Sequence, residues 1–250
     1  MLRRRRRTPK GPPAPQPVEP GRARRQRPLA LITGFDAFGG ESINPSWQIC
    51  EQLPSEIAGV RVVTRRLPCE FRRAIEVAAE AIERERPSVV ICVGQAGGRA
   101  HLCVERVAIN VDDARIGDNG GNRPIDEPIA VMGPAAYFAT LPIKAMVHAM
   151  RGAGVPAEIS NSAGTFVCNH VMYGVLHYLA KGSPSPLGEG RGERKTRAGF
   201  IHVPYSEDQV LDKPAIAAMS LATMVKGIEA AIAAAVTHEA DLKLEGGALD

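Results

Sequence analysis

Three side chains in this sequence have the types needed for nucleophilic catalysis, and the first is a cysteine. Cys168 follows the segment SNSAGTFV at 160–167 and opens the run CNHVMYGVLHYL at 168–179. A cysteine where an extended segment meets a helix lies among unpaired backbone N–H groups, at the positive end of the helix dipole. Both features favour the nucleophilic thiolate, and the same N–H groups can hold an oxyanion. Taken alone, Cys168 also fits a buried, inert cysteine.

The other two candidates are His202 and Glu105. His202 lies in GFIHVPY at 199–205, near the end of a predicted strand, and open parallel sheets place their sites at that edge. Glu105 lies in HLCVERVAIN at 101–110, where a charge is costly unless it is paired. Glu105 is therefore either half of a structural salt bridge or the group that orients an imidazole in a Cys–His–Glu set. The histidines expected to be solvated or packed on helices are His148, His170 and His177.

The sequence predicts neither a metal nor a cofactor. His101, Cys103 and Glu105 are spaced by two, but three ligands on one strand face reach too far apart to close a tetrahedron easily. The five cysteines are irregularly spaced and include no CxxC pair, which suits neither a zinc site nor a disulfide framework. The Gly-rich segments at 34–40 and 94–99 have neither the GxGxxG nor the GxxxxGK[ST] spacing of nucleotide-binding loops.

The elements that must position these residues alternate between apolar runs and helical patterns. This alternation predicts an α/β fold, with a mostly parallel sheet covered by helices on both faces. The polar, turn-rich stretch at 112–128 is expected to be a long loop, a kind of segment that is often functional. Strands are expected at 29–33, 60–67, 88–93, 104–111, 157–161 and 199–203, and helices at 45–57, 71–86, 143–150, 168–180 and 213–237.

Charge is unevenly distributed along the 250 residues, whose formal net charge is +4. Residues 1–28 contain nine Arg, one Lys and one Glu, and residues 181–198 carry +3, so the remaining body carries −8. We expect 1–28 to be a disordered basic, Pro-rich tail and 29–250 to be a single domain. The low-complexity segment 181–198 is expected to be a surface loop inserted into that domain.

Localisation follows from what the sequence lacks. Residues 1–28 contain no apolar run long enough for a signal peptide, and nowhere are there about 18 uninterrupted apolar residues to span a membrane. An odd number of cysteines suits a reducing compartment. We therefore expect a cytoplasmic protein with no membrane partner.

Several motifs together resemble one known family. The resemblance to pyroglutamyl peptidase I, also called pyrrolidone-carboxylate peptidase, extends from about Leu29 to Glu229, and the motifs around Glu105 and Cys168 are its most specific parts. It implies a three-layer α/β/α sandwich, a homo-oligomer that is commonly a tetramer, and a metal-independent thiol protease. The motifs are TGFDAFGG at 33–40, NPSW at 44–47, GQAGGR at 94–99, ERVAIN at 105–110, SNSAGTFVCN at 160–169 and FIHVPY at 200–205.

The resemblance also implies the reaction and the residues that perform it. An N-terminal pyroglutamyl (5-oxoprolyl) residue would be removed from a peptide through a thioester acyl-enzyme, with Glu105, Cys168 and His202 as the triad. Phe35 and Phe38 would sandwich the flat ring of the substrate. The other implied substrate-binding residues are Asn44, Gln95, Arg115, Ile116, Phe166 and Val167.

The chain departs from the family pattern in a few places. Members usually have Pro where Ala37 stands, and Ser or Thr where Cys103 stands; both positions bear on pocket geometry rather than on the triad. The segment 181–198 lies between Cys168 and His202, where a poor fit would disturb the site.

Two alternative functions are compatible with parts of the sequence. One is a catalytically inactive α/β binding module, but all three triad residues are present, which argues against it. The other is a nucleic-acid-associated protein, in which the run Arg3–Arg7 binds phosphate. The acidic body offers no second basic surface for such a partner, so we do not expect nucleic acid to be bound.

Overall fold

A seven-stranded sheet forms the centre of the computed structural model, which describes residues 28–182 and 195–246. The strand order is β2-β3-β1-β4-β9-β5-β8. The two strands β1 and β4 are buried at every residue, as expected of strands covered on both faces. The strands are β1 (Leu29–Phe35), β2 (Glu56–Ile57), β3 (Val60–Leu67), β4 (Val89–Gln95), β5 (Leu102–Glu105), β8 (Ala157–Ser160) and β9 (Arg197–Val203).

The sheet is mixed but mostly parallel, as predicted. Strands β3, β1, β4 and β9 all run the same way. The pair β5 and β8 is parallel within itself but antiparallel to β9, and the short β2 is antiparallel to β3. The carboxyl end of β5 therefore points away from the edge at which β4 and β9 end.

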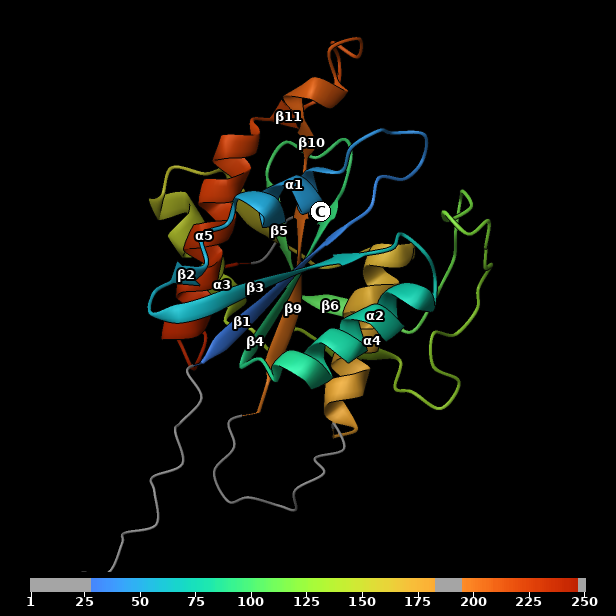
Figure 1. Ribbon diagram of the computed structural model, residues 1–250, viewed down its shortest axis with the longest axis horizontal. Helices are drawn as coiled ribbons and strands as arrows, with labels where there is room; N and C mark the ends of the chain where they lie inside the picture. Colours follow the sequence, from blue (N-terminus) through green and yellow to red (C-terminus); the bar gives the residue numbers. More distant parts are fainter. Residues whose placement is uncertain (1–27, 183–194, 247–250) are drawn as a thin grey trace, which may run out of the picture.

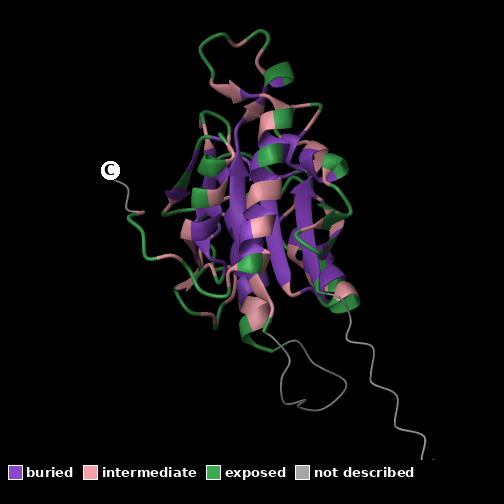
Figure 2. Cartoon of the chain, turned by 90° about the vertical axis from the view of Figure 1, so that its left-hand side faces the viewer, coloured by how far each residue is buried: buried purple, intermediate pink, exposed green. Residues whose placement is uncertain are grey.

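Five helices cover the two faces and give the three-layer sandwich (Figure 1). On one face lie α1 (Pro45–Gln52), α3 (Ile143–Gly152) and α5 (Leu221–Thr237); on the other lie α2 (Arg73–Glu85) and α4 (Val167–Ala180). Each helical layer packs on its own apolar cluster, and the buried strands between them form the core seen in Figure 2. Within the described ranges, no helix combines the length and apolar character needed to cross a membrane.

Two small paired elements stand outside the main sheet, and the sequence pattern did not predict them. Strand β6 (Val107–Ile109) pairs with β7 (Ala136–Phe138). Strand β10 (Tyr205–Ser206) pairs with β11 (Ala218–Met219), joined through a 3-10 turn. The first strand of each pair directly follows an interior strand of the main sheet, β6 after β5 and β10 after β9.

Helix boundaries were predicted less well than the strands. The helix expected at 45–57 ends at Gln52, before Pro54, and the chain turns into β2. The helix expected from 213 begins at Leu221, because the hydroxyl of Ser220 accepts the N–H of Thr223 and caps the helix there.

The single strand expected at 104–111 is divided at Arg106 into β5 and β6. The Arg106 N–H still donates to Ser160 O of β8 (2.8 Å), whereas its carbonyl accepts the N–H of Ala139 beyond β7 (2.9 Å). Its guanidinium is held by Asn161 Oδ1 (2.9 Å). Arg106 is thus the residue at which the chain leaves the main sheet.

Parts of the predicted organisation lie outside the described residues. These are residues 1–27 of the expected disordered tail and 183–194 of the expected surface loop. The described end of that loop differs from the prediction, because β9 begins at Arg197 and Thr196 Oγ1 already donates to Pro87 O (2.7 Å).

Candidate active site

The candidate site lies where the ends of β4 and β9 meet the start of α4. Gly94 of β4 and His202 of β9 are paired in register, and His202 is also paired with Cys103 of β5. Because β5 runs antiparallel to β9, its carboxyl end carries Glu105 inward from His202 rather than out to solvent. Glu105 is consequently fully buried, and His202 is 4% exposed.

Glu105 and His202 form a direct pair. Oε1 of Glu105 accepts a hydrogen bond from Nδ1 of His202 at 2.7 Å and another from Nη1 of Arg99 at 2.9 Å. The second carboxylate oxygen, Oε2, is buried and has no partner among the described residues. A carboxylate at Nδ1 keeps the proton on that nitrogen, which leaves Nε2 as a base.

Cys168 is the second residue of α4. Its helix begins after Phe166, which provides no side-chain cap, so the first N–H groups of α4 remain open. The sulfur lies directly over the backbone of Gly94, since a Cβ at that glycine would be 2.9 Å from Sγ. The structure records no hydrogen bond between the described Sγ and the ring of His202. Catalytic hydrogen bonds are often long before a substrate is bound.

The ionisation of Cys168 differs from the sequence expectation. Its position at a helix start led us to expect a lowered pKa. Burial, and then the nearby Cys69 and Glu105, instead raise the pKa of the Cys168 thiol well above its ordinary value, and Arg99 opposes them only in part. The resting group is a thiol at neutral pH, so forming the nucleophile requires a base.

A cavity of about 460 Å³ opens beside Cys168, and His202 lines it as well. Val167 does not line this cavity, because its side chain is fully buried in the apolar cluster under α4. The sequence did not single out Cys69, Asp113 or the backbone turn at 163–165, which also line it. The predicted substrate-binding residues that do line it are Phe35, Phe38, Asn44, Gln95, Arg115, Ile116 and Phe166.

Aromatic rings form the apolar part of this cavity. The ring centroids of Phe38 and Phe166 are 6.0 Å apart, and Phe166 packs edge-on against Phe71 at 5.4 Å. Phe35 is only 2% exposed and packs against Phe200 at 6.3 Å. Phe38 and Phe166 are only partly buried, whereas Phe35 is anchored in the core. A substrate ring held between Phe35 and Phe38 stays a prediction.

The two amide side chains at the cavity differ in how many of their hydrogen-bonding atoms are already paired. Oδ1 of Asn44 caps α1 by accepting from the N–H (3.1 Å) and hydroxyl (2.8 Å) of Ser46, and its Nδ2 donates to Asp36 O (2.9 Å). Asn44 therefore fixes the turn that carries Phe38. Gln95 accepts a hydrogen bond from Gln209 at its Oε1 (3.0 Å), which leaves its Nε2 as a donor beside the cavity.

The predicted long loop at 112–128 is an ordered structure. Oδ2 of Asp118 accepts the N–H of Phe71 (2.7 Å), and Oδ1 accepts the N–H of Asn122 (2.7 Å). Asn119 donates through Nδ2 to Ala37 O (2.9 Å). These bonds tie the loop to the segments on both sides of the cavity, and they hold Arg115 at its mouth.

A second buried histidine–carboxylate pair lies under the same loop. Nδ1 of His170 and Oδ2 of Asp112 are 2.7 Å apart, and both residues are buried. Nε2 of His170 accepts the backbone N–H of Arg72 at 2.7 Å. Arg72 has a φ of +62°, a conformation that side-chain-bearing residues rarely adopt. Sequence reasoning missed this pair because its members are separated by 58 residues.

Comparison with known proteins identifies relatives of the whole domain. A model of the pyroglutamyl peptidase family matches residues 29–238. The pyrrolidone-carboxylate peptidase of Erwinia tasmaniensis is 51% identical over 219 residues, which cover 87% of this chain and 97% of the relative. That of Cupriavidus taiwanensis is 53% identical over 223 residues, covering 89% and 99%.

Solved structures agree with the sequence comparison. The crystal structure of pyroglutamyl peptidase I from Bacillus amyloliquefaciens has a TM-score of 0.79 and 42% identity, covering 86% of this chain and all of the other. The pyrrolidone carboxyl peptidase of Thermococcus litoralis has a TM-score of 0.80 and 38% identity, covering 87% and 99%. The similarity therefore includes the fold and nearly the full length of these enzymes.

Proposed function

This chain belongs to the pyroglutamyl peptidase family and is a cysteine hydrolase, and we propose that Cys168, His202 and Glu105 are the triad with which it removes N-terminal pyroglutamyl residues from peptides. The observation that carries this proposal is the buried 2.7 Å pair between His202 and Glu105, beside a cavity that Cys168 also lines. The helix start that carries the nucleophile, the base and the carboxylate that orients the base therefore lie together beside the cavity.

In the proposed acylation step, Nε2 of His202 takes the proton of the Cys168 thiol. The sulfur attacks the carbonyl carbon of the pyroglutamyl residue, and the C–N bond to the next residue breaks. The imidazolium returns its proton to the leaving amine, so the products are a thioester and a shortened peptide. Glu105 holds the proton-bearing Nδ1 in place throughout.

Deacylation repeats the sequence with water as the nucleophile. Nε2 of His202 removes a proton from water, and the hydroxide attacks the thioester carbonyl. As the C–S bond breaks, the imidazolium returns the proton to the sulfur, which releases pyroglutamate and restores the thiol. The oxyanion of both tetrahedral intermediates can be held by the open N–H groups at the start of α4, one of which belongs to Cys168. Arg115, at the cavity mouth, adds positive potential.

Substrate selection follows from the chemistry of the pyroglutamyl ring. The ring carries no ammonium group, so an acidic anchor would gain nothing; it offers a flat apolar surface, one lactam N–H and one lactam C=O. In this proposal Phe38 and Phe166 supply the apolar walls, and Nε2 of Gln95, whose Oε1 is already paired with Gln209, donates to the lactam oxygen. A peptide with N-terminal proline lacks that oxygen and leaves the donor unpaired, which rejects it by roughly 10⁴-fold.

We also propose that the enzyme acts as a homo-oligomer, commonly a tetramer in the family that it resembles. Large apolar side chains on and before β7 support this: Val131 is 84% exposed, Met132 91% and Phe138 68%. Light scattering on the purified protein measures the mass directly. Met132→Asp is expected to lower that mass, and a wild-type protein with the mass of one chain would contradict the proposal.

We also propose that the protein is cytoplasmic and consists of one folded domain. All five cysteines are free, which supports a reducing, cytoplasmic location. The family model and the continuous seven-stranded sheet support one domain from residue 29 onward. The expected basic tail at 1–28 is proposed to be accessory to it.

The central test replaces the nucleophile. Cys168→Ala is expected to lower kcat on a pyroglutamyl amide reporter by roughly 10⁴-fold or more, with little change in melting temperature. Cys50→Ala is the matched control, because Cys50 is buried in the opposite apolar cluster and should leave kcat within about threefold. Activity retained in Cys168→Ala would show that the mechanism is wrong.

A further inference from the structure

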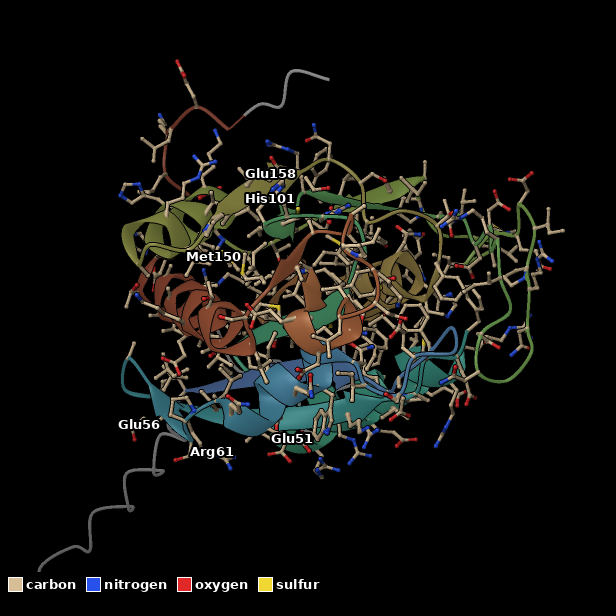
Figure 3. The ribbon with its side chains drawn as sticks, turned by 90° about the horizontal axis from the view of Figure 1, so that it is seen from above. Glu51, Glu56, Arg61, His101, Met150 and Glu158 are labelled. Carbon is tan, nitrogen blue, oxygen red and sulfur yellow. The ribbon has the colours of Figure 1, made fainter. Side chains whose placement is uncertain are left out.

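We propose that His101, Cys103 and Glu158 form a binding site for a zinc-type transition-metal ion on the β5–β8 pair. One ligand atom from each of the three lies within 4.8 Å of the others. Nε2 of His101 is 2.6 Å from Oε1 of Glu158, and Sγ of Cys103 is 3.8 Å from the same oxygen. The labelled side chains of His101 and Glu158 lie together in Figure 3.

Strand register, rather than sequence spacing, creates this cluster. His101, Cys103 and Glu105, whose spacing argued against a metal site, do not come together, because Glu105 is turned to His202 and Arg99. The third position is taken by Glu158 from the neighbouring strand β8, which is paired directly with Cys103 in the parallel ladder. Two of the three donors therefore stand on adjacent, hydrogen-bonded strands, which hold a site more precisely than loops do.

The donor set selects the class of ion. One thiolate, one imidazole and one carboxylate are ligands that Zn²⁺ accepts in tetrahedral sites, whereas Mg²⁺ and Ca²⁺ prefer oxygen ligands alone. Ligand atoms around a tetrahedral zinc are about 3.3–3.7 Å apart, given Zn–N and Zn–S distances of about 2.0 and 2.3 Å. The His101–Glu158 contact must therefore open slightly, which two partly exposed side chains can do.

Access and charge both permit an ion to enter. The side chains of His101 and Glu158 are 33% and 48% exposed, while Cys103 is buried beneath them. A solvent molecule can therefore occupy the fourth position. Arg99, which interacts with the thiol of Cys103, is also held in a 2.9 Å ion pair with Glu105, so its charge is partly offset.

Metal binding exchanges water ligands for three protein ligands. The aquo ion gives up its waters to the three protein ligands and keeps one in the fourth tetrahedral position, a bond forms between the metal and Sγ of Cys103, and the thiol proton passes to solvent. His101 presents the lone pair of Nε2 and keeps its proton on Nδ1. The Glu158 carboxylate supplies the third bond and one further negative charge.

The test uses the full chain carrying Cys168→Ala, so that the proposed nucleophile cannot bind cobalt together with His202. Titration with Co²⁺ is expected to give one equivalent of tetrahedral d–d bands together with a cobalt–thiolate charge-transfer absorption. Zn²⁺ should displace the cobalt. Zn²⁺ at 100-fold its dissociation constant should raise the melting temperature by roughly 5 °C, because only the folded chain holds the site.

Variants separate this proposal from a simple surface ion pair. Adding Cys103→Ser should abolish the charge-transfer absorption, and adding Glu158→Gln or His101→Ala should weaken Co²⁺ binding at least tenfold. The matched control is Glu51→Gln, a surface carboxylate on the opposite side of the molecule in Figure 3, which should bind as before. No thiolate absorption, or the same absorption in Cys103→Ser, would overturn the proposal.

Discussion

Two buried histidine–carboxylate pairs in this molecule have the same geometry but different surroundings. In each, Nδ1 lies 2.7 Å from one carboxylate oxygen: His202 with Glu105, and His170 with Asp112. In each, the other carboxylate oxygen is buried without a partner in the part of the chain that the structure describes. A short, buried pair of this kind therefore does not by itself indicate catalysis.

The difference lies at the second ring nitrogen. Nε2 of His170 accepts the N–H of Arg72, so its lone pair is permanently used to hold a backbone with a φ of +62°. None of the described residues donates a hydrogen bond to Nε2 of His202, and the ring lines the cavity that Cys168 shares. The first pair can only position the chain, whereas the second keeps a base available to a substrate.

The largest expected effect comes from making the same isosteric change in both pairs. Glu105→Gln should lower kcat by roughly 10³-fold, because an amide at Nδ1 favours the tautomer that carries its proton on Nε2. Asp112→Asn should lower kcat less than about tenfold. Steady-state kinetics on a pyroglutamyl amide reporter measure both, and equal losses in the two variants would erase the distinction.

A smaller effect is expected when the structural histidine is replaced. His170→Gln should lower the free energy of unfolding by about 2–3 kcal/mol, because the buried Asp112 carboxylate and the Arg72 N–H both lose their partner. Urea unfolding measures this change. The exposed His148→Gln serves as control and should change stability by less than about 0.5 kcal/mol. An unchanged free energy of unfolding in His170→Gln would show that the His170–Asp112 pair contributes little to stability.

The smallest effect concerns a carboxylate that has no histidine partner. Burial works against ionisation of Asp118, but hydrogen bonds from Asn122, Phe71 and Gly120 outweigh it and lower the pKa of its carboxyl. Its folded pKa is below the unfolded value of about 3.9, so its stabilisation is present above pH 4 and lost as pH falls through the folded pKa.

Asp118→Asn should therefore destabilise the protein by roughly 1–2 kcal/mol at pH 7, with the difference from wild type shrinking in acid. Urea unfolding at a series of pH values measures it. A difference that is independent of pH would assign the effect to packing rather than to the charge.

Much of the fold was predictable because apolar pattern and burial coincide. Strand β3 was predicted residue for residue at 60–67, and the sandwich followed from alternating elements. The reversed direction of β5 was not predictable, since an apolar run has the same pattern in either direction. That reversal places Glu105 beneath His202 and Cys103 beside Glu158.

For the candidate site, the sequence indicated which residues take part but not how each of them is buried. The motifs pointed to Cys168, His202 and most cavity residues through family resemblance. A motif does not show, however, which side chains contact one another in the fold. The motifs placed Val167 in the pocket although its side chain is packed in the core. Separately, the position of Cys168 at a helix start suggested a lowered pKa, whereas burial raises it. Burial depends on the elements packed around a residue, which the local sequence does not contain.

The way α4 and β9 are arranged has a practical consequence for handling this protein. Cys168 stands at the first turn of α4 and His202 near the far end of β9, whereas Ala180 and Arg197 mark the opposite ends of the same two elements. A 14-residue helix is about 20 Å long, so the described attachment points of the segment between them are remote from the reacting atoms. A fluorescent reporter attached at Ala180, the described end of α4, would therefore stand far from the proposed nucleophile Cys168.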